Sequence, residues 1–476
     1  MVSREESRIP NYLILLLALG AGLALGSLVA VDLPAAAVLV FLLLFSVLIF
    51  SDLRTGPILV AFFLPFQKTF TLEIAGYTLK TSQLLVIVTL FAWAAYLFRQ
   101  KEHGVARTPM NFPLVLFLAA SLVSMVNAIN LVRSVAIFSW ALFSVLLFIT
   151  MASLIRDEGL LKKVIGSLII SGTLVSLFGI YQFVGSYLGL PTLLRDVYLP
   201  TGMYLTRVQS TFLEPLHFAS YLLVVIPLCL ALYLGRVEQF NPRYLFFALL
   251  TMSLAMILTI ARGGYLGLVV SVVVIFLFSR RGVRKKSSIL KVAFSFAVVI
   301  LALFMLIVYL APPGIITTTI FGGKAIRAGS SFTRMLLMKD AWAMFQESPL
   351  IGIGIGNFGP YANQKAFRST TNVADLGTAN NVPLEVLAES GILGFIALAL
   401  IFLAYLKGMW QALMRTKSRF LSALLVGLLA SFFGLSFQYL TYSPFYGEWT
   451  WFMLGLSMAA ANLAKKALPG KAMTLT

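Results

Sequence analysis

Three arginines stand where hydrophobic runs of the sequence end. Arg207 precedes the segment 210–215, Arg262 lies in the short turn 261–264, and Arg334 begins a helical pattern. A guanidinium group binds phosphate through two parallel hydrogen bonds, and it is costly in a membrane without a partner. Each arginine is therefore a candidate for binding a phosphate or pyrophosphate group. Anchoring to lipid headgroups or a structural ion pair is the alternative.

Arg262 is the most informative of the three. It joins two apolar runs, and no other charged residue lies between Arg243 and Arg280. Gly263 and Gly264 follow it directly, and glycines let a bulky group approach the backbone. The turn is thus suited to binding a phosphate group.

Acid–base chemistry has fewer candidates. His217 and Glu214 follow Arg207 closely, and Glu385 and Glu389 are four residues apart, which places them on one face of a helix. His217 can act as a base near neutral pH, whereas the alternative is a hydrogen-bonded histidine near a helix start. Both readings stay open at this point.

The glycine-rich segment 348–358 resembles a phosphate-binding loop only superficially. It lacks the Lys-Ser/Thr ending that such loops use to hold nucleotide phosphates and magnesium. We interpret it as a glycine-rich turn that packs closely against neighbouring helices.

The elements that position these residues must lie in a membrane. Of the 476 residues, 60% are hydrophobic and 11% are charged, and the mean hydropathy is +0.96. A soluble fold cannot hide so much apolar surface. The net charge of +19 does not indicate a nucleic-acid partner, because the basic residues concentrate in short turns between apolar runs, as they do in membrane proteins. The lone Cys229 cannot form an intrachain disulfide.

The sequence predicts an all-α polytopic membrane protein with about 12–14 transmembrane helices, since each crossing needs about 17–25 apolar residues. The hydrophobic runs are Asn11–Val31, Pro34–Phe50, Pro57–Phe66 (a short run that fits a half-span), Ser82–Leu97, Phe112–Asn127, Ser134–Leu154, Val164–Leu188, Leu216–Gly235, Tyr244–Ala261, Gly264–Phe278, Leu290–Leu310, Leu384–Leu406, Leu421–Leu440 and Trp449–Leu463.

Charge distribution predicts the orientation. The cluster 280–286 and most other basic residues fall in alternate turns, which are then cytoplasmic, and both termini lie inside. We expect three regions: an N-terminal bundle 1–310 with an outer loop 191–215, a long extracytoplasmic loop 311–383, and C-terminal helices with a basic cytoplasmic tail, 384–476.

The long loop should contain an amphipathic helix. Phe332, Met335, Met338, Trp342 and Phe345 recur at helical spacing. Ser330 or Ser331 is a possible N-cap, and Pro349 should end the helix. We expect its apolar stripe to lie on the outer membrane surface or to pack on the bundle.

These motifs together resemble the O-antigen ligase and O-antigen polymerase superfamily of bacterial envelope glycosyltransferases. Four matches occur in the family's order and on the same predicted side of the membrane. They are Arg207 with Ser210-Thr211-Phe212-Leu213-Glu214-Pro215, the turn Ala261-Arg262-Gly263-Gly264, the stretch from Arg334 to Phe358, and Asn380-Asn381-Val382-Pro383-Leu384-Glu385 continuing to Glu389-Ser390-Gly391-Ile392-Leu393-Gly394.

The resemblance implies a metal-independent glycosyltransferase without a cofactor. It would move a glycan from undecaprenyl pyrophosphate to a hydroxyl on a glycan, a lipid A core or another acceptor. Such enzymes build surface polysaccharides such as O-antigen (in lipopolysaccharide), exopolysaccharide or capsule. The implied location is the bacterial inner membrane, with the active face extracytoplasmic. Arg207 and Arg262 would hold the pyrophosphate, and Arg334, Glu214, Asn381 and Glu385 would contact substrate.

One position departs from the family pattern. The family histidine that orients or deprotonates the acceptor hydroxyl is Asn380 here. Asparagine can hydrogen-bond a hydroxyl but cannot act as a base near neutral pH. His217, Glu385 and Glu389 are the candidates to replace it. Two other functions compete: a transporter or flippase of lipid-linked sugars, and a family member that binds the glycan without catalysis.

Overall fold

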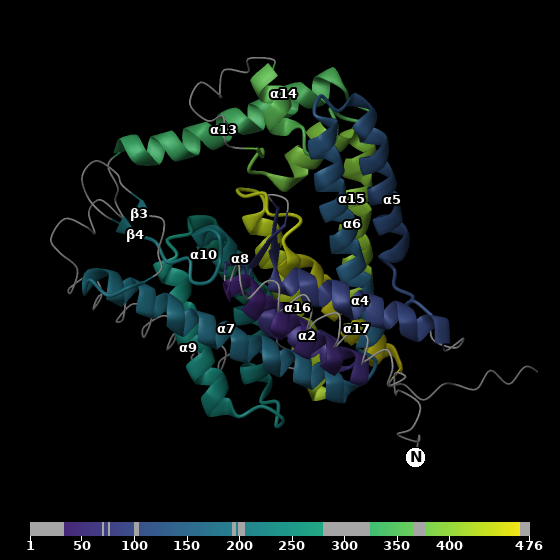
Figure 1. Cartoon of the computed structure of the whole chain (residues 1–476), viewed down its shortest axis with the longest axis vertical. Coiled ribbons are helices and arrows are strands. Elements are labelled where there is room, and N and C mark those ends of the chain that lie inside the picture. Colours follow the sequence, from purple (N-terminus) through teal and green to yellow (C-terminus); the bar gives the residue numbers. More distant parts are fainter. Residues whose placement is uncertain are drawn as a thin grey trace, which may run out of the picture.

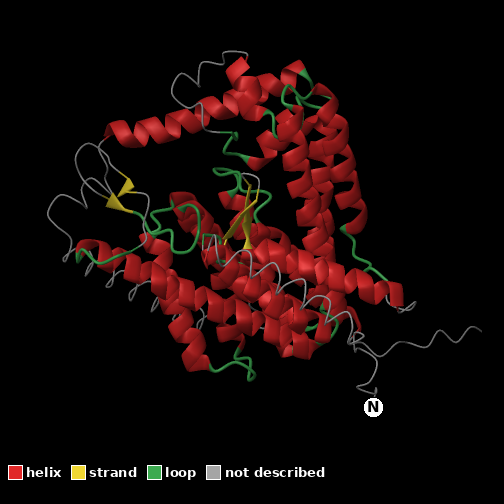
Figure 2. Cartoon of the chain, in the orientation of Figure 1, coloured by secondary structure: helices red, strands yellow, loops and turns green. Residues whose placement is uncertain are grey.

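The structure is a computed structural model of the chain. It describes residues 33–68, 71–74, 77–99, 104–192, 197–198, 205–278, 324–364 and 377–466. Within these ranges the chain is mostly helical (Figure 2). The hydrophobic runs predicted at 11–31 and 290–310 lie outside the described residues.

Most helices follow the hydrophobic runs within a few residues. The helices are α2 (Leu33–Ser51), α3 (Thr55–Phe63), α4 (Thr81–Arg99), α5 (Asn111–Ser124), the 3-10 helix η1 (Met125–Asn127), α6 (Leu131–Leu154), α7 (Glu158–Tyr187), α8 (Pro215–Gly235), α9 (Pro242–Leu258), α10 (Arg262–Phe278), α13 (Lys324–Glu347), α14 (Phe358–Gln364), α15 (Val382–Arg415), α16 (Arg419–Gln438) and α17 (Glu448–Lys466). However, α7 begins six residues before its predicted run, and α15 extends nine residues beyond its own.

Several helix starts are set by side chains that cap free backbone N–H groups. The Asp157 carboxylate accepts a hydrogen bond from the Leu160 N–H at the start of α7. Ser418 caps α16 in the same way. The sequence thus defines where the helices begin, while their apolar faces define what they pack against.

Among the described residues, six helices are long and apolar enough to cross a membrane: α4, α6, α7, α8, α15 and α16. Shorter apolar helices include α9 and α10. Large apolar side chains such as Phe112 and Val126 are exposed on the outside of the bundle, as lipid-facing positions would be. The predicted all-α polytopic membrane fold is therefore confirmed.

The centre of the bundle is formed by α8, α10 and α16, which pack on one another. Small residues allow this close approach. A Cβ atom on Gly267 of α10 would lie 2.6 Å from the carbonyl oxygen of Gly434 on α16. The Ser271 hydroxyl donates a hydrogen bond at 2.9 Å to the Ala430 carbonyl across the same interface.

Two short antiparallel hairpins add to the predicted helices. β1 (Thr71–Ile74) pairs with β2 (Tyr77–Lys80), and β3 (Val197–Tyr198) pairs with β4 (Leu205–Thr206). β2 runs directly into α4, so the first hairpin places Lys80 at the start of a membrane helix.

Helix α13 begins earlier than predicted. It begins at Lys324 rather than at Ser330 or Ser331, and it ends just before Pro349 as predicted. Its buried apolar residues include Leu337, Ala341 and Met344, and α13 packs on α15. Met335 and Trp342 of the predicted stripe are 46% and 49% exposed, whereas Met338 and Phe345 are half-buried. The stripe therefore lies at the edge of the buried face. In Figure 1, α13 extends sideways across the top of the molecule.

Candidate functional site

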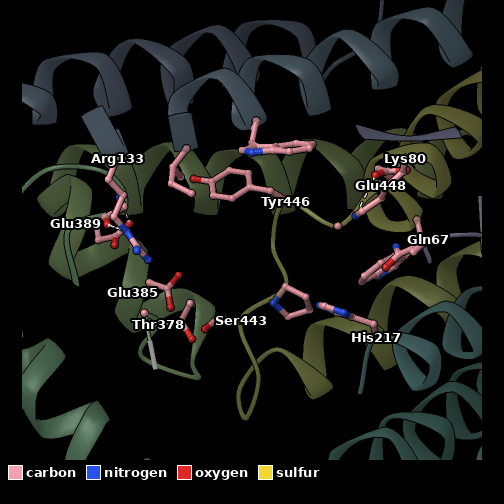
Figure 3. A pocket seen from close by; sticks show the side chains of 17 residues that line it. Gln67, Lys80, Arg133, His217, Thr378, Glu385, Glu389, Ser443, Tyr446 and Glu448 are labelled. Carbon is pink, nitrogen blue, oxygen red and sulfur yellow. Dashed lines mark hydrogen bonds and ion pairs between the residues drawn. The ribbon is translucent and has the colours of Figure 1, made fainter. Parts of the chain in front are cut away.

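A cavity of about 420 Å³ lies where residues from distant parts of the chain meet (Figure 3). Its walls carry charged, amide and aromatic side chains, as ligand sites do. It is lined by Gln67, Lys80, Arg133, Ile137, Trp140, His217, Gly356, Gly377, Thr378, Glu385, Glu389, Ser443, Pro444, Tyr446, Gly447, Glu448 and Trp449.

Glu385 and Glu389 enter the cavity wall from the first turns of α15, on one face as their spacing predicts. Glu389 is 6% exposed, and its two carboxylate oxygens accept hydrogen bonds from the N–H groups of Gly356 at 2.8 Å and Phe358 at 3.0 Å. Glu385 accepts one from the Ala379 N–H at 2.8 Å. Glu389 is therefore occupied in holding the glycine-rich turn, while Glu385 has a carboxylate directed at the cavity (Figure 3).

The glycine-rich segment packs tightly against α15, as the sequence predicted. α15 is interrupted at Gly391, whose φ is 61°. The interruption frees helix carbonyls, and those of Ala388 and Glu389 accept hydrogen bonds from Ile353 and Gly354, each at 3.0 Å. A Cβ atom on Gly352 would lie 2.4 Å from backbone atoms of Glu389. Only glycine fits there, so the segment serves packing rather than nucleotide binding.

Arg133 of α6 connects this segment to the cavity. Its Nε donates a hydrogen bond to the Gly356 carbonyl at 2.7 Å. Its Nη2 would lie 2.3 Å from a Cβ atom on Gly377, so the glycine leaves room for the guanidinium group. Figure 3 shows Arg133 beside Glu389 and Glu385. The positive charge thus lies next to the buried carboxyl group of Glu389 and the half-buried one of Glu385.

The opposite wall contains a buried ion pair. The Lys80 Nζ lies 3.4 Å from Oε1 of Glu448, a residue that is 2% exposed. Gln83 donates a hydrogen bond to the same oxygen at 2.8 Å, and the Ser82 hydroxyl donates to Oε2. A buried carboxylate needs such partners, and here the start of α4 supplies all three.

His217 lies in the first turn of α8, between two aromatic residues. Its ring centre is 5.3 Å from that of Trp449 and 5.7 Å from that of Tyr442. It lines the cavity, and its buried Nδ1 has no hydrogen-bond partner among the described residues. The structure therefore places His217 in the cavity wall, and its catalytic role stays a prediction.

Arg207 and Arg262 meet at the turn between α9 and α10. Nε of Arg207 donates to the Thr259 carbonyl at 3.1 Å, and Nη2 donates to the Ile260 carbonyl at 3.4 Å. Ile260 has a φ of 53°, which is unfavourable for a β-branched residue and requires support from its surroundings. Arg207 provides this support, while the Arg262 side chain is exposed at the N-terminus of α10.

Glu214 is an exposed neighbour of the cavity. It precedes α8, and its carboxylate accepts a hydrogen bond from the Tyr442 hydroxyl at 3.1 Å. Burial, followed by the charge of Glu214, raises the pKa of Tyr442 above its ordinary value. Tyr442 therefore stays protonated. Its hydrogen bond to Glu214 joins the segment 441–447 to the residues that follow Arg207.

The other predicted residues lie outside the cavity lining. Asn380 adopts a left-handed backbone conformation, with φ 54°, which asparagine tolerates. Asn381 caps α15, because its side chain accepts a hydrogen bond from the Leu384 N–H and donates one to the Leu440 carbonyl, each at 3.0 Å. Arg334 is half-buried on α13. Asn381 thus has a structural role that its sequence position did not reveal.

Several lining residues escaped the sequence interpretation, among them Gln67, Lys80, Arg133, Tyr446 and Glu448. They lie singly at the ends of hydrophobic runs without a recognisable motif. Arg133 and Glu448 did carry a signal, because each is a charge at the edge of an apolar run. No group of three or more His, Cys, Asp or Glu side chains within the described ranges could hold a metal ion.

The class of protein follows from this arrangement: a multi-pass helical membrane protein with a polar cavity between helix ends. A protein-family model described as O-Antigen ligase matches residues 247–399, a range that includes Arg262, Arg334 and Glu385. The chain is also 26% identical over 144 residues to the teichuronic acid biosynthesis protein TuaE of Bacillus subtilis (strain 168). That match covers 30% of this chain and 28% of TuaE.

These two similarities confirm the resemblance to the O-antigen ligase and polymerase superfamily. They support a glycosyltransferase-like role in polysaccharide biosynthesis. The match to TuaE spans under a third of either protein, so the particular donor and acceptor belong to the proposed function.

Proposed function

We propose that the chain transfers a glycan from undecaprenyl pyrophosphate to an acceptor hydroxyl at the extracytoplasmic face of the bacterial inner membrane, with both termini cytoplasmic. The observation that carries the proposal is the segment 441–447. A Cβ atom on Gly263 would lie 2.6 Å from Oγ1 of Thr441, Tyr442 contacts Glu214 and His217, and 443–444 and 446–447 line the cavity. One segment thus connects the arginine turn with the cavity carboxylates.

The arginines would bind the leaving group. Arg262 is exposed and follows directly on the turn that Arg207 stabilises, so its guanidinium is free of burial and near the edge of the bundle. Oriented cations that face developing negative charge are effective catalysts. We assign Arg262 to the pyrophosphate and Arg207 to positioning the turn, through its hydrogen bonds to the Thr259 and Ile260 carbonyls.

Glu385 is our choice for the base that replaces the family histidine. It lines the cavity, whereas Asn380 does not. In the proposed step the acceptor hydroxyl gives its proton to the Glu385 carboxylate, and the hydroxyl oxygen forms a bond with the anomeric carbon. The bond from that carbon to the pyrophosphate oxygen breaks, and the electron pair leaves with undecaprenyl pyrophosphate. The Arg133 guanidinium lies beside this carboxyl pair and faces the same end of the cavity.

The test uses purified full-length protein, a lipid-pyrophosphate-linked glycan and a hydroxyl acceptor. Arg262→Ala and Glu385→Gln should each lose transfer. Arg243→Ala is the matched control for Arg262, because Arg243 is also an exposed arginine at a helix start. Transfer that survives loss of Arg262 or Glu385 would refute the assignment of that residue.

The same preparation distinguishes the competing functions. Binding of the lipid-linked glycan without any transfer would favour a non-catalytic family member. Movement of the lipid-linked glycan across vesicle membranes without transfer would favour a flippase. A cysteine introduced at Leu350, which is 68% exposed and lies in the predicted extracytoplasmic loop, reports the orientation, since it should react with an impermeant reagent added from the extracytoplasmic side.

A further inference from the structure

One end of the cavity carries polar groups that the proposed transfer step does not use. Gln67, Lys80 and Glu448 lie together there (Figure 3), and Trp449, the residue after Glu448, lines the same cavity. We call these four residues the Gln67 cluster. They come from three parts of the chain: the turn after α3, the start of α4 and the start of α17.

Gln67 provides the main observation. Its side chain is 1% exposed, it lines the cavity, and neither its amide oxygen nor its amide nitrogen has a hydrogen-bond partner among the described residues. Leaving a buried amide unpaired costs about 1–3 kcal/mol for each unsatisfied group. Native proteins retain such groups where they have a role, such as binding a ligand.

The backbone holds Gln67 in this position. The N–H groups of Gln67 and Lys68 both donate to the Thr211 carbonyl, at 3.1 and 2.9 Å. The Thr211 hydroxyl donates in return to the Pro65 carbonyl at 2.6 Å. The turn is therefore fixed to the segment that follows Arg207. Backbone hydrogen bonds hold Gln67 in place, and its side-chain amide takes no part in them.

Lys80 and Glu448 complete the donor and acceptor set. The ammonium group of Lys80 has three protons, and Glu448 accepts from it at 3.4 Å. The side chain of Lys80 is 19% exposed, in contrast to 2% for Glu448. The ammonium group of Lys80 is thus the more accessible of the two charges. The carboxylate of Glu448 beside it balances its positive charge. A ligand at this end meets hydrogen-bonding groups with little net charge.

These groups suit the hydroxyl groups of a sugar ring. Each hydroxyl both donates and accepts, and an amide offers the same pair of functions. The Trp449 ring supplies an apolar surface in the same cavity. A phosphate is unsuited, because the Glu448 carboxylate repels it, and a lipid tail would leave the amide unpaired.

We propose that the Gln67 cluster is a saccharide subsite that binds uncharged hydroxyl groups of a sugar ring in the cavity. The inference rests on the proposed function and deepens it, since it names what recognises the glycan rather than the pyrophosphate. The sugar can come from the lipid-linked donor or from the acceptor, and both present the same hydroxyl chemistry.

The substitution Gln67→Met tests the subsite, because it removes the amide and keeps the volume. An amide that binds only ligand should be replaceable without loss of stability. Gln209→Met is the matched control: Gln209 is also 1% exposed, its amide is also unpartnered among the described residues, and it does not line the cavity. We expect the thermal unfolding midpoints of both variants to equal or exceed that of the unmodified protein.

Binding is measured through tryptophan fluorescence, since Trp140 and Trp449 line the cavity. Three probes are compared: lipid-pyrophosphate-linked oligosaccharide extracted from cells that make the protein, undecaprenyl pyrophosphate alone, and the oligosaccharide released from its lipid by mild acid. Loss of one or two hydrogen bonds should weaken glycan binding of Gln67→Met roughly five- to thirtyfold. Gln209→Met should bind like the unmodified protein, and undecaprenyl pyrophosphate alone should bind all three equally.

The three probes distinguish a donor sugar from an acceptor sugar. They also separate a failure of the subsite proposal from a failure of the proposed function. A Gln67→Met effect confined to the lipid-linked glycan assigns the subsite to the donor, and an effect on the released oligosaccharide assigns it to a soluble acceptor chain. Unchanged glycan affinity in Gln67→Met, or a lowered unfolding midpoint, overturns the subsite. Equal binding of glycan-bearing and bare lipid, with no binding of free oligosaccharide, also overturns it but leaves the pyrophosphate proposal standing. That proposal fails instead if Arg262→Ala retains transfer.

Discussion

Glu389 and Glu385 are both cavity carboxyl groups on α15, yet they should respond differently to the same substitution. Glu389→Gln keeps one acceptor oxygen and converts the other into a donor. Because Glu389 accepts from both Gly356 and Phe358, one of these buried N–H groups loses its partner. The lost charge-assisted bond and the unsatisfied N–H together cost roughly 2–4 kcal/mol.

The effect should be local to the glycine-rich turn. Amide hydrogen exchange reports local opening, and a loss of about 2 kcal/mol in opening free energy accelerates exchange roughly thirtyfold. We expect peptides that contain Gly356 and Phe358 to exchange faster in Glu389→Gln, with a lower thermal unfolding midpoint in detergent.

Glu385→Gln is the matched comparison. Glu385 accepts a single backbone hydrogen bond, from Ala379, which the remaining oxygen of glutamine can keep. We expect near-unchanged exchange at the turn and an unfolding midpoint close to that of the unmodified protein, together with loss of transfer. Unchanged exchange at Gly356 and Phe358 in Glu389→Gln would refute the assignment of a supporting role to Glu389.

Three further predictions concern the rest of the fold. Gly352→Ala should destabilise the protein by more than about 3 kcal/mol in a thermal unfolding assay, because its φ is +77° and a Cβ would clash with the α15 backbone. Gly104 has open space around it, so Gly104→Ala should be neutral in the same assay. Lys80→Met should cost about 3–5 kcal/mol by removing the counter-charge of the buried Glu448 carboxylate, and adding Glu448→Gln should recover most of the loss in a double-mutant cycle. Burial raises the pKa of Tyr446 well above its ordinary value, so this tyrosine ionises first in the unfolded state and stability should fall above about pH 10. In Tyr446→Phe, the unfolding midpoint should fall less steeply with pH in this range. An unchanged pH dependence would contradict the assignment to Tyr446.

The hydrophobic runs predicted the helices well because a membrane span needs a minimum length of apolar residues. The start of α8 at Pro215 and the end of α16 at Gln438 lie within a few residues of their predicted bounds. The face of α13 was not predictable in this way. Apolar residues lie on two of its sides, and only the partner helix decides that Leu337 and Ala341 are buried rather than Trp342.

The site was predictable only in part. The grouping of His217 and Glu385 in one cavity agrees with the roles considered from sequence, because both lie in short motifs near a helix start. Gln67 and Glu448 carried no motif, and their meeting depends on how α3 packs on α4 and α7 and how α17 packs on α6 and α15. Such long-range contacts follow from three-dimensional packing and not from spacing along the chain.

The cavity is completed late in synthesis, because one of its walls comes from α17 near the C-terminal end of the described chain. Glu448 and Trp449 belong to the first turn of α17, which packs on α6 and α15, whereas Gln67 and Lys80 are synthesised long before. Membrane chains are made from the N-terminus onward. The earlier helices are therefore made before the α17 wall of the cavity exists. A partly made chain therefore has no enclosed cavity, and the cavity is complete only when α17 has docked on α6 and α15.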